Sequence, residues 1–265
     1  TARISADWPG LATAYLQSEM PGVTALFLQG CLGNINAHDM SFRRDDVILA
    51  QKVADMRTGD VAIRLVDQIL PALRTLQTRP GVALSAAWKV LSLPCTAPDT
   101  AELQRTIERY LPTAERSTLA ELRPLHQRIG SESDEEKAWR EARYQVDAAR
   151  SQLDLLERGA LEVQAPVQVL RLGEAAIVGW PGEIYVELGL ELRQRSPVPL
   201  TFVAGFANDT VGYIPTPAAY ESQGQPNEFG VYPTYLTPRI YGRLPFRADV
   251  GRILVEETLD LIRNS

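Results

Sequence analysis

The chain has 265 residues, of which 45% are hydrophobic and 23% are charged, as is typical of globular proteins. These values exclude a disordered tail or a collagen-like fibre, and the length suits one large domain or two small ones. The net charge of −6, without a block of lysine or arginine, argues against nucleic-acid binding, and no apolar run approaches the ~20 residues of a membrane-spanning helix.

The first part of the chain is predicted to form a helix, a buried strand and a second helix. Asp7, before Trp8 and Pro9, is typical of a helix start with a capping carboxylate. The continuous apolar run over residues 23–28 predicts a buried strand. Apolar spacing over residues 59–76 predicts a helix packed on a sheet, and alternation over 82–93 predicts one long strand or a pair.

The middle of the chain, residues 100–159, is strongly charged, and we interpret it as an inserted helical hairpin. Ser133 precedes three acidic residues and so offers a helix cap with acids in the first turn. Apolar residues from Trp139 to Leu156 follow at helical spacing. Such a stripe is typical of packing between helices rather than of a binding surface.

Strands and helices alternate again after residue 159. Strands are predicted over residues 163–172, 175–178 and 200–206, and helices over residues 184–194 and 246–262. Residues 218–245 are rich in Gly, Pro, Tyr and Asn, which is typical of an ordered functional loop. The alternation predicts an α/β fold, or α+β, with a mixed sheet core flanked by helices.

Three predicted strands end in loops rich in Gly, Asn and acidic residues, and these loops are the main indication of a functional site. They follow residues 28, 178 and 206. In open α/β sheets, ligands bind beyond the carboxyl ends of the strands. We therefore expect the three loops to converge on one site.

Common catalytic motifs are few in this sequence. His38 follows the first strand-end loop, whereas His126 lies in the charged helical region and is interpreted as a surface residue. Two histidines cannot form a three-histidine zinc site, and the sequence has no H-E-x-x-H, nucleophile elbow or P-loop. Thr1 is disfavoured as an N-terminal nucleophile because the residues behind it resemble the middle of a longer segment.

The two cysteines, Cys31 and Cys95, are too few for a disulfide framework. They form either one bridge or two unrelated thiols, and two buried free thiols are the favoured interpretation. Cys31 lies in the first strand-end loop, but a cysteine nucleophile needs a positioned base, and only His38 is available there.

Four segments in order resemble the neutral/alkaline non-lysosomal ceramidase family, which includes many bacterial ceramidase-like members. They are ISADWPG, LQGCLGNINAH, WPGE followed by a helix, and FANDTVGYIPTPAAYESQG. The resemblance reaches residue 229 and leaves out the middle helical stretch. It implies that residues 1–265 form the C-terminal part of a single catalytic domain, in a secreted or periplasmic hydrolase of lipid-like amides or esters.

The same resemblance implies a Zn²⁺ ion held by two histidines, a glutamate and a tyrosine. The Pro-Gly-Glu motif places the glutamate at Glu183, and the motif Gly-Tyr-Ile-Pro-Thr places the tyrosine at Tyr213. From the residues alone, Glu183 is equally an acid at a helix N-terminus and Tyr213 a packed aromatic. The family's histidines precede ISAD, so both are expected from a segment of the same protein upstream of Thr1.

The sequence departs from the family at the nucleophile. The family's Gly-Asp-Val-Ser-Pro motif matches residues 33–37, so Asn36 stands where the family has serine, and an amide is no nucleophile. We therefore expect zinc-activated water to cleave an amide (C–N) or ester bond, with Asn34, Asn36 and His38 at the reacting centre.

Three further residues are expected to contact the substrate: Gly33, Asn208 and Asp7, the last also being a candidate partner of a metal ligand. Two alternatives stay open. One is a non-catalytic binding or scaffold protein that retains the ceramidase fold. The other is a serine-type ceramidase that uses a different hydroxyl, such as that of Ser5 or Thr210.

Overall fold

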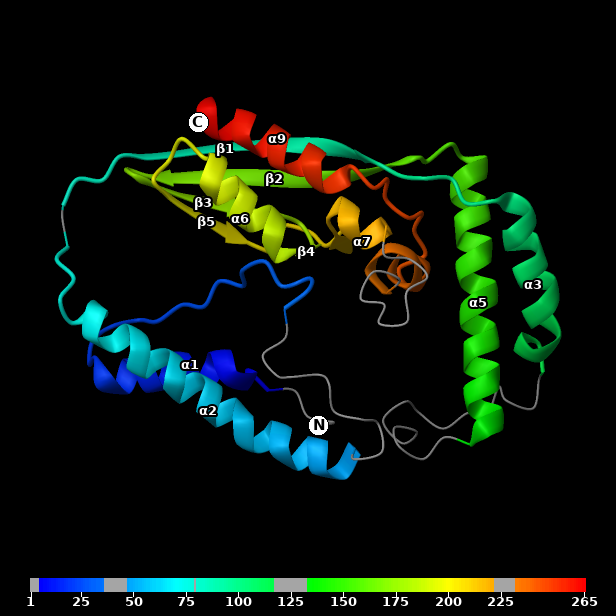
Figure 1. Ribbon diagram of the computed structural model, residues 1–265, viewed down its shortest axis with the longest axis horizontal. Helices are drawn as coiled ribbons and strands as arrows, with labels where there is room; N and C mark the ends of the chain where they lie inside the picture. Colours follow the sequence, from blue (N-terminus) through cyan, green and yellow to red (C-terminus); the bar gives the residue numbers. More distant parts are fainter. Residues whose placement is uncertain (1–4, 36–46, 79, 117–132, 222–231) are drawn as a thin grey trace. The chain divides into compact units, whose positions relative to one another are not determined.

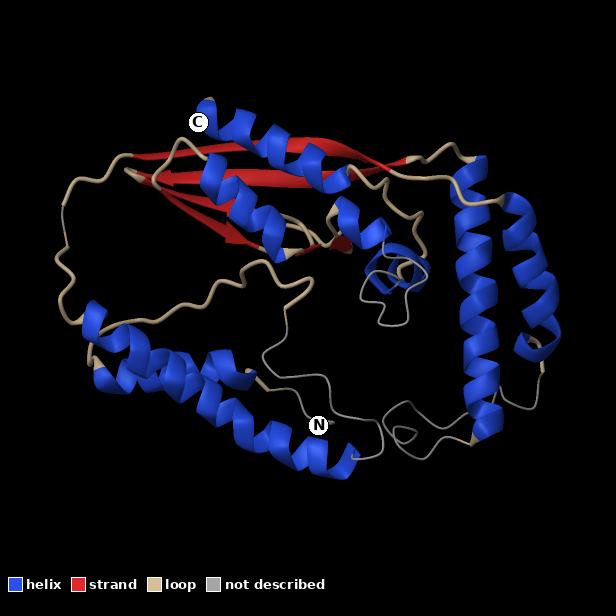
Figure 2. Ribbon diagram, in the orientation of Figure 1, coloured by secondary structure: helices blue, strands red, loops and turns tan. Residues whose placement is uncertain are grey.

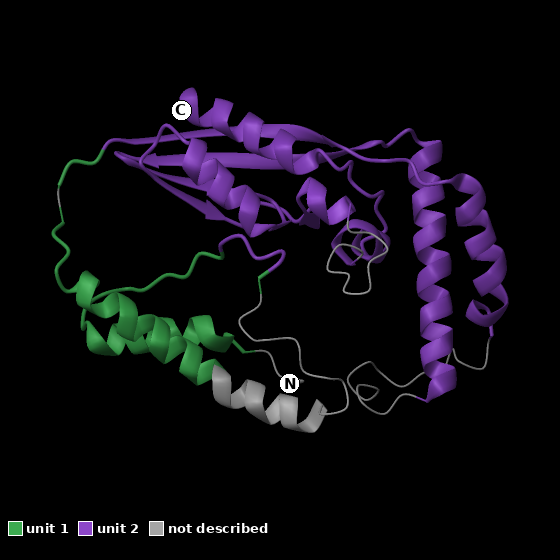
Figure 3. Cartoon of the chain, in the orientation of Figure 1, with its two compact units in different colours: residues 1–29, 35–82 green, residues 30–34, 83–265 purple. Residues whose placement is uncertain are grey.

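The computed structural model describes residues 5–35, 47–78, 80–116, 133–221 and 232–265, with only the backbone over 47–57. The chain divides into two compact units (Figure 3). Unit 1 comprises residues 1–29 and 35–82, and unit 2 comprises residues 30–34 and 83–265. The predicted functional residues Glu183 and Tyr213 both lie in unit 2.

Unit 1 is built on two helices, α1 (Asp7–Glu19) and α2 (Val47–Leu73), which pack against each other. Ala12 of α1 and Ala62 and Val66 of α2 are buried between them. The N-cap of α1 is Ala6, which makes no side-chain capping bond. Asp7 is therefore the first helical residue and not the cap, although its Oδ1 accepts a hydrogen bond from the Trp8 N–H at 2.7 Å.

The strand expected over residues 23–28 is not formed, and this prediction was wrong. The run lies outside any strand, with Leu26 85% and Leu28 61% exposed. The Ala25 N–H donates to Oε1 of Gln17 at 3.0 Å instead of to a neighbouring strand. An apolar run meets the hydrophobic condition for a buried strand, but the backbone also needs a partner strand, and the described residues supply none.

Unit 2 contains a four-stranded mixed sheet, as predicted (Figures 1 and 2). Its strands are β1 (Leu84–Pro94), β2 (Glu162–Leu172), β3 (Ala175–Gly179) and β5 (Leu200–Ala204), in the order β1-β2-β3-β5. The first two pairings are antiparallel, and β3 pairs with β5 in parallel. The predicted α/β class, with a mixed sheet core, is confirmed.

Two helices, α6 (Val186–Arg195) and α9 (Val250–Arg263), lie across one face of this sheet (Figure 1). The main core lies beneath them. Trp180, which follows β3, is fully buried there, and its Nε1 donates to Oγ1 of Thr258 at 2.9 Å. The Thr258 hydroxyl in turn donates to the Leu254 carbonyl at 2.6 Å, so the buried polar atoms are paired.

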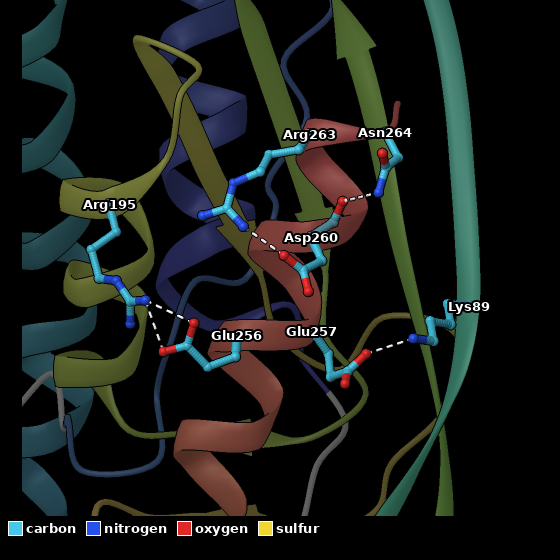
Figure 4. Close-up of polar contacts among 7 residues, drawn as sticks. All are labelled: Lys89, Arg195, Glu256, Glu257, Asp260, Arg263 and Asn264. Atoms are coloured by element: carbon cyan, nitrogen blue, oxygen red, sulfur yellow. Dashed lines mark hydrogen bonds and ion pairs between the residues drawn. The ribbon is translucent and has the colours of Figure 1, made fainter.

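Ion pairs also join α9 to its neighbours on the surface (Figure 4). Glu256 pairs with Arg195 of α6, and Glu257 pairs with Lys89 of β1. Exposed pairs of this kind contribute about 0–1 kcal/mol each, so the apolar core dominates the packing of α9.

The opposite face of the sheet carries exposed apolar side chains. Trp88 of β1 is 71% exposed, and Leu170 of β2 and Phe202 of β5 are also exposed. Side chains alternate along a strand, and the buried Val167 and Val169 belong to the face that α9 covers. The described helices of unit 2 therefore cover one face of its sheet.

A helical hairpin is inserted between β1 and β2, as predicted. It consists of α3 (Thr100–Ala114) and α5 (Asp134–Glu157), which pack against each other. Ser133 and Glu136 form the expected capping box at the start of α5. No helix of the described residues is long and apolar enough to cross a membrane.

Short elements surround the end of the sheet. A two-stranded parallel pair consists of β4 (Glu183–Ile184) and β6 (Tyr213–Ile214). The chain continues through α7 (Pro217–Glu221), the π-helical turn η3 (Tyr232–Leu236) and α8 (Thr237–Ile240) to α9. Most of α7, and all of η3 and α8, fall in residues 218–245, the segment predicted to be an ordered functional loop.

The bond between Trp180 and Thr258 gives a test of the core. In Thr258→Val the indole N–H loses its acceptor in a buried place, which should lower the free energy of unfolding by about 1–3 kcal/mol. Thr258→Ser keeps the hydroxyl and loses one methyl group, so its loss should be smaller, about 1 kcal/mol. Urea denaturation measures both, and a serine variant less stable than the valine variant would contradict this account.

Candidate functional site

The β4–β6 pair brings together two residues that lie in separate strand-end loops. β3 and β5 are parallel, so the loops that follow them leave the same edge of the sheet. The Glu183 N–H donates to the Gly212 carbonyl at 2.9 Å, and the Tyr185 N–H donates to the Ile214 carbonyl at 3.1 Å. In this register Glu183 is directly paired with Tyr213.

The Glu183 carboxylate is buried beside two phenols and accepts a hydrogen bond from one of them. Glu183 is only 9% exposed, and its Oε1 accepts from the Tyr241 hydroxyl at 3.1 Å. The Tyr213 phenol is paired with Glu183 across the β4–β6 ladder and is close enough to interact with its carboxylate. Burial and the neighbouring Glu183 raise the pKa of both phenols, so they carry protons at neutral pH and act as donors.

The described residues offer Glu183 no cationic partner. None of the ion pairs that they form includes it. A buried carboxylate costs free energy unless hydrogen bonds or an opposite charge compensate for its lost hydration. Here the compensation that the described residues supply is the hydrogen bond from the Tyr241 hydroxyl, with the Tyr213 phenol beside it.

This donor set fits part of a zinc site. The Glu183 carboxylate and the Tyr213 phenol supply two converging oxygen atoms, and zinc accepts oxygen ligands alongside nitrogen. Among the described residues, no three of His, Cys, Asp or Glu gather as metal ligands. The structure brings the two predicted ligands together, and their role as ligands stays a prediction.

The strand-end loop that was expected to carry the reacting groups is anchored beside Glu183. The Gly33 N–H donates to the Ile184 carbonyl at 2.8 Å. A Cβ at Gly33 would stand 2.5 Å from the Glu183 carbonyl oxygen, so only glycine permits this approach. The loop is therefore held against β4 by its backbone.

Asn34 attaches the same loop to the start of α6. Its Oδ1 accepts from the Val186 N–H at 2.9 Å, and its Nδ2 donates to both carboxylate oxygens of Glu187, at 2.9 and 2.8 Å. The N-cap residue Tyr185 makes no side-chain capping bond, so Asn34 supplies that bond from a distant part of the chain. A catalytic part for Asn34 stays a prediction.

The other predicted residues fall in different places. Asn36 and His38 lie outside the described residues. Asn208 follows β5, and its Nδ2 donates to Oε1 of Gln168 at 3.4 Å. Asp7 belongs to unit 1, where it lines a pocket with Ser5, and Thr210 follows Asp209 in unit 2.

Sequence reasoning missed Tyr241 and Glu187. Tyr241 lies in the Gly-, Pro- and Tyr-rich segment that predicted a functional loop, but nothing local singles out this tyrosine. Glu187 stands four residues after Glu183 in the first turn of α6, where an acid is typical of a helix start. Its pairing with Asn34 spans 153 residues and has no local signal.

Comparison with known proteins supports the fold. No protein-family model and no curated protein sequence matches the chain. A crystal structure of neutral ceramidase from Pseudomonas aeruginosa matches 98% of the chain, with a TM-score of 0.53 and 15% identity. A ceramidase complexed with C2 matches 98% of it, with a TM-score of 0.54 and 14% identity.

The chain has the fold of neutral ceramidase. It spans 40% and 42% of the lengths of these two structures. The ceramidase resemblance of the four sequence segments is thereby confirmed at the level of the fold.

Both cysteines are free thiols in the structure, in agreement with the favoured interpretation. Burial raises the pKa of Cys31 to about 11 and that of Cys95 to about 11. A thiol in this state is protonated at neutral pH and is a poor nucleophile. Cys31, although it lies in the strand-end loop, is therefore inert and packs beside α6.

Two Asn34 variants test whether this side chain anchors the loop. Asn34→Ala removes its bonds to α6 and should lower the free energy of unfolding by about 1–2 kcal/mol. Asn34→Asp keeps the acceptor for the Val186 N–H but places a second carboxylate beside Glu187. It should therefore be destabilised at pH 7 and recover near pH 4, as urea titrations at both pH values would reveal. Equal stability of Asn34→Asp and the parent protein at pH 7 would contradict the anchoring role.

The thiols predict a loss of stability at high pH. In the unfolded chain a thiol ionises near pH 9.0, whereas in the folded chain it ionises near 11. Between these values the unfolded state releases protons that the folded state keeps, so the free energy of unfolding falls as the pH rises. A Cys31→Ala/Cys95→Ala double variant should lose less stability from pH 9 to 11 in urea denaturation. Parallel curves for the two proteins would refute this.

Proposed function

We propose that the chain is part of a ceramidase-type hydrolase, in which Glu183 and Tyr213 supply two ligands to a zinc ion. The observation that carries the proposal is the Glu183 carboxylate, which is buried at the strand ends, accepts a hydrogen bond from Tyr241, lies beside the Tyr213 phenol and has no cation among the described residues. The similarity of the chain's fold to that of neutral ceramidase supports this assignment.

The remaining ligands would be the two histidines that the family resemblance implies in a segment upstream of Thr1. A bound zinc ion would lower the pKa of water and polarise a carbonyl group. Glu183 would contribute a carboxylate oxygen and Tyr213 its phenol oxygen. The substrate that fits this proposal is a lipid-like amide or ester, since both structural neighbours are ceramidases.

The nucleophile in this proposal is water, because Asn36 stands where the family has serine. The Asn36 amide would donate a hydrogen bond to the substrate oxygen on which negative charge develops. Asn34, two residues earlier in the sequence, fixes the start of this loop on α6. Gly33 and Asn208 are proposed to line the substrate site, and the expected substrate contacts of His38 and Asp7 stay predictions.

A second candidate function is a non-catalytic binding or scaffold protein with the same fold. The observation that favours it is Asn36, which removes the family's nucleophile. The two candidates differ in their need for metal, because the hydrolase requires zinc and the scaffold does not.

Variants of the full-length protein distinguish the candidates. Glu183→Ala should abolish both zinc binding and activity on a panel of amides and esters, because it removes a ligand. Asn36→Ala should keep zinc and lower kcat by ~10²–10³, the scale of one lost oxyanion donor. Zinc content is measured by atomic absorption on each purified variant.

A matched control is Glu174→Ala, which removes an exposed carboxylate from the β2–β3 turn at the other end of β3. It should leave zinc content and activity unchanged. Activity that survives in Glu183→Ala would overturn the metal assignment. Zinc-loaded parent protein without activity on any amide or ester would favour the scaffold.

A further inference from the structure

Tyr241 reaches the Glu183 carboxylate from a distant element. It follows α8 and lies 58 residues from Glu183 along the chain, yet its hydroxyl donates to Oε1 at 3.1 Å. The Tyr241 residue is 46% exposed, so its ring adds little to the core. The specific interaction of the Tyr241 side chain is therefore its hydrogen bond to Glu183, and not packing in the core.

The backbone around Gly212 holds this arrangement together. Gly212 has φ +94°, and a Cβ there would stand 3.4 Å from ring atom Cδ2 of Tyr241. The carbonyl of the same residue accepts the Glu183 N–H at 2.9 Å. Gly212 thus supports the backbone of Glu183 and leaves the space beside it free for the Tyr241 ring.

Arg243 makes a further contact with the ring. The guanidinium carbon of Arg243 lies 6.0 Å from the centroid of the Tyr241 ring, within the range of a weak cation–π contact. This contact restricts the orientation of the ring whose hydroxyl donates to Glu183.

We propose that Tyr241 is a positioning residue for Glu183, an inference that rests on the proposed zinc site. By donating to Oε1, Tyr241 would restrain the orientation of the carboxylate that is proposed to hold the ion. Tyr213 is the other proposed ligand, so Tyr241 would be the phenol that stays hydrogen-bonded to Glu183 when zinc is bound. Carboxylates that bind metals are commonly oriented by such hydrogen bonds, whose loss weakens metal affinity ~10–100-fold.

The test compares Tyr241→Phe with the parent full-length protein in zinc affinity, measured by competition with a chelator. The variant removes one oxygen atom and keeps the ring, so the fold should persist, with a melting temperature lowered only by the loss of one hydrogen bond to Glu183. Zinc affinity should fall ~10–100-fold. In protein loaded with Co²⁺, the visible absorption spectrum should also change, because the carboxylate is no longer fixed.

The matched control is Tyr235→Phe, a nearby tyrosine that is 40% exposed and whose hydroxyl contacts Arg239 and Glu102 instead of Glu183. Its zinc affinity and spectrum should equal those of the parent. Equal affinity and spectra for Tyr241→Phe and the parent would overturn the positioning role while leaving the zinc site intact. A parent protein that binds no zinc, or a Glu183→Ala variant that binds it as tightly, would overturn the proposed function itself.

Discussion

The burial of one carboxylate, that of Glu183, imposes the constraint on which the local structure around the strand ends depends. Removing a carboxylate from water costs several kcal/mol unless donors replace the lost hydration. The backbone meets part of this need by placing Glu183 opposite Tyr213 in the β4–β6 pair. Tyr241 supplies a further donor from the turn after α8. Three segments that are far apart in the sequence thus meet because one buried charge requires them.

The backbone around Glu183 is fixed because the residues on both sides of it are anchored in the core or on a helix. Trp180, three residues before Glu183, is fully buried and hydrogen-bonded to Thr258 of α9. On the other side, α6 begins three residues after Glu183, and Oδ1 of Asn34 accepts the hydrogen bond of the first N–H of this helix, that of Val186. Glu183 therefore lies on a short link between two fixed points, and a group held in this way is suited to binding an ion with a defined geometry.

Local patterns in the sequence predicted most of unit 2, because its strands and helices bury one face each. The alternation along β2 and the capping box at Ser133 are examples, since each depends on residues close together in the chain. The run over residues 23–28 failed because a strand depends on a distant partner, which apolar composition does not reveal. Tyr241 and the capping role of Asn34 were missed for the same reason: their contacts span 58 and 152 residues.

The free-energy cost of burying the Glu183 carboxylate also bears on the choice between the proposed hydrolase and the scaffold. A protein that serves only as a scaffold gains nothing from a buried carboxylate, because apolar replacements of buried ionic groups are often neutral or stabilising. Here the carboxylate is buried, and the Tyr241 hydroxyl donates to it beside the Tyr213 phenol. The asparagine at position 36, where the sequence resemblance implies a serine, leaves this arrangement in place. Under the proposed function a cation bound at Glu183 would offset the cost of burial, which is why we propose the hydrolase ahead of the scaffold.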